Sequence, residues 1–437
     1  MKNKTVLIGL DGAPYGLVSD LANRGVMPNF QALKAQAVFA KMQAPLPAIS
    51  SVSWSSIITG QNPGSHGIFG FTDLAPRSYD LVFPNFNDLQ APAFWQKYPK
   101  TKQVVLNAPS TYPVKTMNGV HIAGFISPDL QQAVFPAKYL PKLAELKYEI
   151  DVDSELAHQS TERFLENLFQ VNQARIAAYR YFWQEIDWDI FWLVFTGSDR
   201  LGHFLFNAYT SPNHQYHTNF LDYFKQVDAV IGEIAERLAP EDGLLIFSDH
   251  GMAENKANVN VNYFLQANGF LQLDKSPVEF YNQISPQSVA FALEPGRIYL
   301  NKKGKYPNGR VKEAQEENIL QELSDGFSQL EFQGQRIIER VCRKEQIYSG
   351  PELSRAPDLV LDEKPGFRLR AGLNKNELFD KDIFTGTHTA NDAFLLVKPP
   401  QGIDLSLLNP KVEDIVGILE KIIEVGAKLF RSEILDF

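Results

Sequence analysis

Cysteine is almost absent from this sequence, which has a single one, Cys342, among its 437 residues. One cysteine excludes an intramolecular disulfide and a cluster of thiolate metal ligands. Any metal site in this protein therefore has to be built from histidine and acidic side chains.

Long apolar runs and long basic runs are also missing. No segment approaches the roughly 20 apolar residues that cross a bilayer, and the apolar stretch at residues 5–10 is too short for the core of a signal peptide. The formal net charge is -9, which argues against a nucleic-acid polymer or an anionic membrane as the partner. We expect a cytoplasmic protein that acts on small molecules, and its oligomeric state stays open.

Short apolar runs alternate with amphipathic helical patterns. The helical patterns cover residues 154–185, 219–238 and 412–425. Runs that are apolar throughout are typical of strands buried on both faces of a parallel sheet. They lie at residues 5–10, 104–106, 190–195, 244–247 and 393–397. The alternation predicts a doubly wound α/β fold, with a mostly parallel sheet and helices on both faces.

Residues 255–370 have a different character, with scattered Gly, Pro and Asn and isolated strand-like pieces such as residues 296–301. We expect a single catalytic domain over residues 1–437. Residues 255–370 would be an accessory or lid region inserted in it, without a second core.

Acidic and histidine residues follow four of the predicted strands or stand close to them. Asp11 follows the first strand, and Asp199-x-x-x-His203 follows the third. Asp249-His250 follows the fourth, and His388 stands just before the last. Ligands of an open parallel sheet bind at the carboxyl ends of its strands. Imidazole and carboxylate together suit zinc, or a metal such as manganese or iron.

Each of these motifs alone has a simpler interpretation. Asp11-Gly12 is typical of a turn, and Asp199 and His203 could occupy a solvated helical turn. The same residues four apart would also share one helix face. Asp249 and His250 can reach one site only where the chain leaves the strand, and Gly251 would allow that turn. Together, at four strand ends, the motifs favour a metal site.

These motifs resemble the type I phosphodiesterase and nucleotide pyrophosphatase family of the alkaline phosphatase superfamily, and its bacterial and archaeal members more than its animal ones. The resemblance runs from residue 5 to about residue 399. It is carried by Gly9-Leu10-Asp11-Gly12, residues 50–60 and 62–68, Asp199-x-x-x-His203, Ser248-Asp249-His250-Gly251-Met252 and Gly386-x-His388.

The resemblance implies two divalent metal ions, zinc by preference with manganese or iron as alternatives. One ion would be held by Asp199, His203 and His388. The other would be held by Asp11, Asp249 and His250, together with the oxygen of Ser50. Such an ion activates a serine hydroxyl by lowering its pKa.

Ser50 is the expected catalytic nucleophile, because the family places it nine residues before the Thr of the Thr-Gly pair at Thr59. Ser51 is the alternative, and a simpler interpretation is that the serines here cap a helix over residues 54–59. Ser51, Ser53 and Asn107 are candidates for substrate binding. Asn107 before Ala108-Pro109 is also typical of a turn. Animal members carry Asn at the position of Ser53, which argues against nucleotide substrates.

The expected function is two-metal hydrolysis of a phosphate ester, by preference a diester, through a phosphoserine intermediate. A phosphomonoesterase, a phosphonate hydrolase, a sulfatase and a non-catalytic metal- or phosphate-binding protein are the alternatives. A sulfatase is disfavoured, because residues 50–54 lack the Pro and Arg of its Cys/Ser-x-Pro-x-Arg motif. We expect His66 to be structural, and Trp54, Phe69 and Phe71 to line the mouth of the pocket.

Overall fold

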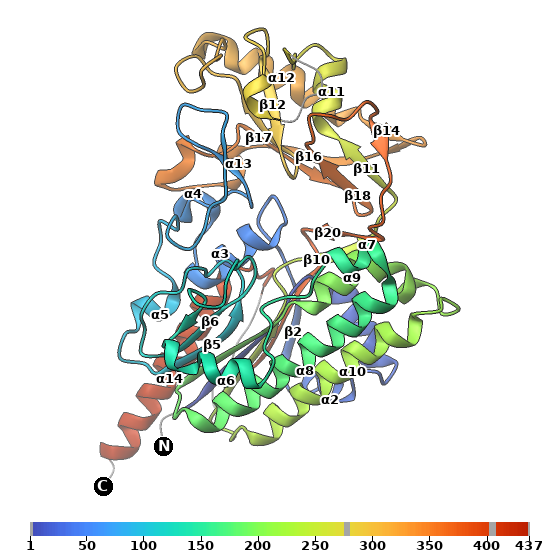
Figure 1. Ribbon diagram of the computed structural model, residues 1–437. Helices are drawn as coiled ribbons and strands as arrows, with labels where there is room; N and C mark the ends of the chain where they lie inside the picture. Colours follow the sequence, from blue (N-terminus) through green and yellow to red (C-terminus); the bar gives the residue numbers. More distant parts are fainter. Residues whose placement is uncertain (1–2, 275–279, 402–407, 436–437) are drawn as a thin grey trace.

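An eight-stranded sheet runs through the computed structural model, which describes residues 3–274, 280–401 and 408–435 (Figure 1). The strand order is β2-β21-β9-β1-β8-β5-β6-β7, and the five strands from β9 to β6 are parallel. The strands are β1 (Thr5–Leu10), β2 (Val38–Met42), β5 (Gln103–Ala108), β6 (Gly119–Ala123), β7 (Val134–Phe135), β8 (Ile190–Phe195), β9 (Gly243–Phe247) and β21 (Ala393–Lys398). The predicted mostly parallel α/β sheet is confirmed.

Helices cover both faces of this sheet because alternate strand residues point to opposite sides. On β1, Val6, Ile8 and Leu10 belong to one buried cluster and Leu7 to another. The first cluster includes residues of α1 (Tyr15–Asn23), α2 (Pro28–Lys34), α8 (Thr161–Glu185), α9 (Gly197–Thr210) and α10 (His217–Arg237). The second includes residues of α3 (Ser50–Thr59), α5 (Phe94–Lys97) and α14 (Asp414–Leu435).

The pattern at residues 154–185 forms two helices rather than one. A short helix, α7 (Glu155–Gln159), precedes α8, and Ser160 lies between them with an extended backbone. The Ser160 side chain accepts a hydrogen bond from the backbone N–H of Arg163, so it caps α8. A serine at an N-cap outweighs the continuity of the apolar pattern.

The accessory region has a core of its own, so the expectation of no second core was wrong. Its four-stranded sheet has the order β12-β13-β17-β16, and buried residues from 257 to 373 form one cluster with Tyr79. The four strands of this sheet are β12 (Ala290–Leu293), β13 (Arg297–Leu300), β16 (Ile338–Arg343) and β17 (Leu359–Glu363). The strands β11 (Ala257–Asn260) and β18 (Phe367–Arg370) pair in a second small sheet, and the helices are α11 (Val261–Ala267) and α12 (Glu313–Ser328). Strands of four residues interrupted by Gly and Pro give only a weak periodic signal in sequence.

Figure 1 shows the accessory region as a separate layer above the short strands β10 (Gly251–Glu254) and β20 (Gly386–Thr389). The division into one catalytic domain with an insertion at residues 255–370 stays a prediction. Among the helices of the described residues, none has the length and apolar character needed to cross a membrane.

Candidate metal centre

The order of the central strands brings the sequence-predicted residues together. β1 lies between β8 and β9, and all three run parallel. Their carboxyl ends therefore meet at one edge of the sheet. Asp11 follows β1, Asp199 lies in the first turn of α9 after β8, and Asp249 and His250 follow β9.

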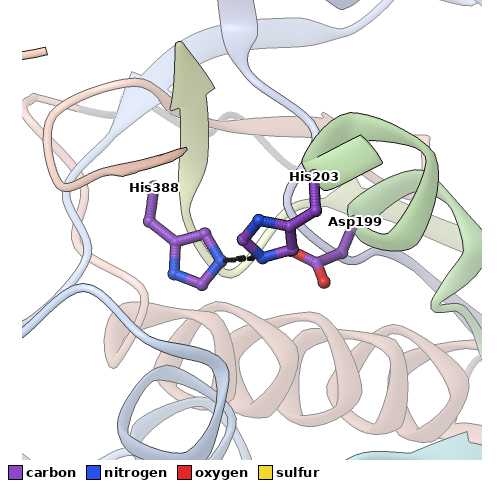
Figure 2. A group of neighbouring side chains, drawn as sticks. All are labelled: Asp199, His203 and His388. Carbon is purple, nitrogen blue, oxygen red and sulfur yellow. Dashed lines mark hydrogen bonds and ion pairs between the residues drawn. The ribbon is translucent and has the colours of Figure 1, made fainter. Parts of the chain in front are cut away.

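Asp199, His203 and His388 form the first of two groups that could hold a metal ion. The Nε2 atom of His388 lies 3.2 Å from Asp199 Oδ1 and 2.8 Å from His203 Nε2, so the three side chains converge on one point (Figure 2). His203 Nε2 lies 3.4 Å from the same Asp199 oxygen. His388 comes from β20, which pairs with β10 and places Met252 opposite His388.

Asp11, Asp249 and His250 form the second group, and all three are buried. His250 Nε2 lies 3.4 Å from Asp249 Oδ2 and 3.7 Å from Asp11 Oδ1. The ring centroids of His250 and His388 are 3.9 Å apart. The two groups are therefore immediate neighbours, as a two-metal site requires.

Each of the three imidazoles is oriented by a backbone carbonyl. The Nδ1 atom lies 3.3 Å from Gly386 O in His203, 3.0 Å from Gly251 O in His250 and 3.0 Å from Ala48 O in His388. An Nδ1–H that donates to a carbonyl leaves the Nε2 lone pair free for a metal ion. This is the usual arrangement around histidine ligands in metal sites.

The charges of the two groups fit divalent cations. Burial, with repulsion from Asp199, raises the pKa of Asp249 to about 7, and burial raises the pKa of Asp11 well above its usual value. Asp249 Oδ2 accepts no hydrogen bond in the part of the chain that the structure describes. Burial also lowers the pKa of His203 to about 4 and that of His388 to about 3. Asp199 differs, because despite its burial the neighbouring His203, His388 and Arg200 hold its pKa well below its usual value. Neutral imidazoles, an ionised Asp199 and the undercompensated acids of the second group make up donor sets that suit cations.

Ser50 lies at the second group. Its Oγ donates a 3.2 Å hydrogen bond to Asp11 Oδ1 and lies 3.1 Å from His250 Nε2. The helix expected to begin near Trp54 begins at Ser50 instead, after Ile49. Ser50 therefore occupies the N-terminus of α3, where the helix dipole favours negative charge on its oxygen.

The sequence profile of the family described as type I phosphodiesterase / nucleotide pyrophosphatase matches residues 5–391. The chain belongs to this family. Membership indicates a phosphoester hydrolase of the alkaline phosphatase superfamily, and members of the family typically depend on two metal ions. No curated protein matches the chain in sequence.

Three solved structures show the same fold at low identity. Phosphonoacetate hydrolase from Sinorhizobium meliloti 1021, in complex with phosphonoformate, gives a TM-score of 0.65 at 16% identity, over 97% of this chain and 96% of that one. Inactive murine ectonucleotide pyrophosphatase/phosphodiesterase 5 in complex with AMP gives 0.55 at 12%, over 97% and 95%. The human enzyme of the same name gives 0.55 at 13%, over 97% and 95%.

The remaining serines of α3 do not cap the helix in this phosphodiesterase family member. Ser55 Oγ donates to the backbone oxygen of Ser51 at 2.6 Å, and Ser56 Oγ lies 2.9 Å from His66 Nε2. The Oγ atoms of Ser51 and Ser53 are buried and have no hydrogen-bond partner among the described residues. Substrate binding by Ser51 and Ser53 stays a prediction.

His66 and Asn107 make their hydrogen bonds within the protein. His66 accepts from the backbone N–H of Ile68 at 3.2 Å, which ties down the turn as expected. The side-chain Nδ2 of Asn107 donates to Val194 O at 3.4 Å, and Tyr148 Oη donates to Asn107 Oδ1 at 3.1 Å. These contacts favour the structural interpretation of Asn107, and substrate binding by it stays a prediction.

Trp54, which we expected at the mouth of a pocket, is fully buried and contacts the candidate metal ligand Asp11. Its indole N–H donates to Asp11 Oδ2 at 3.3 Å. Phe69 is also buried, and only Phe71 of the three lines the cavity beside the metal centre. The expectation was therefore wrong for Trp54 and Phe69, because both side chains pack into buried apolar clusters, Trp54 against the central sheet and Phe69 against Tyr348. The buried indole N–H needs a hydrogen-bond acceptor, and Asp11 is one.

Arg200 binds the outer oxygen of Asp199, and Asp151 binds Arg200; neither role was predicted from the sequence. Arg200 donates from Nη1 to Asp199 Oδ2 at 3.0 Å, and from Nε and Nη2 to Asp151 Oδ2 at 3.0 and 2.6 Å. Arg200 thus occupies the outer oxygen of Asp199, while Oδ1 faces the two histidines. Asp151 lies on a loop far from these strands in sequence, so no local motif marks it.

We expect Asp151→Asn to weaken binding of one metal ion by about 10–100-fold, as loss of an outer-sphere partner typically does. The change loosens Arg200 and removes a nearby negative charge, and both effects disfavour a cation. Metal titration against a competing chelator measures this. Glu233→Gln is the control, since Glu233 pairs with Arg180 and Arg237 away from the site. Unchanged affinity in Asp151→Asn would contradict a supporting role.

Proposed function

We propose that this protein is a two-metal phosphodiesterase in which Ser50 is the nucleophile. The observation that carries the proposal is the position of Ser50 Oγ, within 3.2 Å of two side chains of the second group. The first group lies alongside, through the contact between the His250 and His388 rings. A hydroxyl that can react and two candidate cation sites thus lie next to one another.

The chain's own residues account for the steps. Ser50 Oγ attacks phosphorus, and the bond from phosphorus to the leaving oxygen breaks on the opposite side, toward Asp199, His203 and His388. The proton of the Ser50 hydroxyl passes through solvent to the leaving oxygen, so the result is a free alcohol and a phosphoserine that still carries the second ester group. A water molecule then attacks phosphorus from the leaving-group side, the bond to Ser50 Oγ breaks, a proton returns to Ser50 Oγ, and the phosphate monoester departs.

Two divalent ions, when bound, would lower the pKa of the Ser50 hydroxyl and neutralise charge on the phosphoryl oxygens. The charges agree with two such ions, because three carboxylates and an ionised serine carry four negative charges. Asp11, Asp249, His250 and Ser50 would hold one ion, and Asp199, His203 and His388 the other. Nitrogen and oxygen donors alone suit zinc, manganese or iron.

A phosphonate hydrolase is the second candidate, because the phosphonoacetate hydrolase named above shares the fold along nearly the whole of both chains. The murine neighbour was solved with AMP, yet Ser53 stands where the animal members carry Asn. Other enzymes of the superfamily hydrolyse phosphomonoesters or sulfate esters with the same fold. Pocket residues decide between these substrates, so turnover has to be measured.

We expect the metal-loaded protein to hydrolyse a chromogenic phosphodiester faster than the matching phosphomonoester, phosphonate and sulfate ester. Chelation should abolish turnover, and zinc, manganese or iron should restore it, because both groups need their ions. Metal analysis gives the number of ions bound. Preference for the phosphonate would select the second candidate. Two bound ions without turnover of any ester would instead indicate a metal- or phosphate-binding protein.

A further inference from the structure

A cavity of about 530 Å³ opens beside the first metal group. His203 and His388 form one wall, and the accessory region forms the opposite wall through β18 and residues 371–374. The volume is within the range of sites that hold a small organic ligand. Ser50 does not line this cavity. An in-line reaction sends the leaving group away from Ser50, so this cavity is where the leaving group would lie.

Much of the cavity wall is apolar, including Phe71, Leu81 and Leu293. Apolar walls accept the carbon skeleton of almost any organic group, and the few polar side chains decide which one fits. The strongest polar groups on the accessory wall are Arg368 and Arg370. They stand two apart on β18, so their side chains leave the same face of the strand.

Both arginines are held in place but keep unused donors. Arg368 Nη1 donates to Asp382 Oδ2 at 3.0 Å, and its guanidinium lies 4.1 Å above the Phe384 ring. Arg370 donates from Nε to Glu294 Oε1 at 3.0 Å and from Nη1 to Asp382 Oδ2 at 3.2 Å. Each guanidinium has five N–H donors. Most donors of the pair therefore have no hydrogen-bond partner among the residues that the structure describes and can bind a ligand.

The acidic groups around the pair limit the charge that it can bind. Asp382 and Glu294 balance the two guanidinium groups. Glu363 also lines the cavity, and burial raises its pKa to about 8, so it is mostly uncharged at neutral pH. Because Asp382 and Glu294 already offset the guanidinium charges, a ligand with one negative charge leaves less charge uncompensated than a terminal phosphate with nearly two. Planar guanidinium groups also match the two oxygens of a carboxylate.

We propose that this cavity selects esters whose leaving alcohol carries a carboxylate, which Arg368 and Arg370 bind while the apolar wall contacts the carbon skeleton. The inference deepens the proposed function and rests on it. The accessory region would then set substrate choice, and the metal groups and Ser50 would supply the chemistry.

Two matched substrates test the inference. Methyl 4-nitrophenyl phosphate releases 4-nitrophenol, and its analogue releases 5-hydroxy-2-nitrobenzoate, the same chromophore with one added carboxylate. We expect kcat/KM of the wild-type protein to be about 10–100-fold higher for the carboxylate-bearing ester, as charge-assisted hydrogen bonds permit. In the double variant Arg368→Gln, Arg370→Gln this ratio should fall close to one.

Arg340→Gln is the matched control and should keep the wild-type ratio. Arg340 lies on β16 of the same accessory region and pairs with Asp362 at 2.7 Å, outside the cavity lining. If the double variant does not fold, Arg370→Gln alone serves, because the partners of Arg370 are partly exposed side chains. Equal turnover of the two esters by wild-type protein, or an unchanged ratio in the variant, would overturn the inference and leave the proposed function standing.

Failure of both esters to react would count against the proposed function instead. Calorimetry with 5-hydroxy-2-nitrobenzoate and 4-nitrophenol then still decides the inference. Tighter binding of the carboxylate-bearing product, lost in the double variant, would support it. Equally weak binding of both compounds to the metal-loaded protein would refute it.

Discussion

Ser50→Ala should lower kcat by about 10³-fold or more while most of the metal stays bound. In the proposed reaction Ser50 Oγ forms the covalent bond to phosphorus, so alanine at this position removes the attacking atom. A nucleophile acts as one unit with the groups that activate it, so its removal costs most of the catalytic effect. A 10³-fold loss corresponds to about 4 kcal/mol, well above the roughly 0.3–1 kcal/mol of a helix-terminus interaction.

The matched control for this variant is Ser55→Ala. Ser55 is buried in the same helix, but its hydroxyl bonds to the backbone of Ser51 and not to the site. Metal analysis of Ser50→Ala should still find two bound ions, because Asp11, Asp249 and His250 remain to hold the ion of the second group. Retained turnover in Ser50→Ala together with its loss in Ser51→Ala would move the nucleophile by one residue. Retained turnover in both would assign the attack to water.

Much of the site could be predicted because its parts are local. An apolar run followed directly by Asp11, or by Asp249 and His250, shows both a buried strand and the chemistry at its end. Parallel strands of one sheet share an edge, so the motifs after β1, β8 and β9 converge without knowledge of strand order. The pair Asp199 and His203 is predictable for the same reason, since one helical turn separates them. His388 joins them from β20, through the pairing of β20 with β10, which the sequence pattern does not show.

The parts that could not be predicted depend on contacts between distant segments. Arg200 links Asp151 to Asp199, and the cavity brings Arg368 of the accessory region close to His203 and His388 of the metal centre. Glycine at residue 251 was expected to provide a turn, but it lies in β10, where a side chain would collide with Thr389 and Asp392. A glycine is needed there because β20 approaches β10 closely, and no local sequence pattern shows that approach.

His388→Ala should reduce the number of bound ions from two toward one and lower kcat/KM by more than 100-fold. Loss of an outer-sphere partner costs about 10–100-fold, and loss of one of three ligands should cost more. Two ligands would remain in the first group, Asp199 and His203, too few for tight binding. Atomic absorption for metal content and steady-state kinetics at rising metal concentration measure both effects.

Partial rescue separates a ligand from a merely structural histidine. His388 borders the cavity, so added imidazole can enter the space that alanine leaves, and it should restore part of the activity. His217→Ala is the control, because His217 also contacts a backbone carbonyl, at 2.7 Å, but lies outside both groups. Ser50→Ala should lose turnover with its ions kept, and His388→Ala should lose one ion first. Two full ions in active His388→Ala would show that this histidine binds no metal.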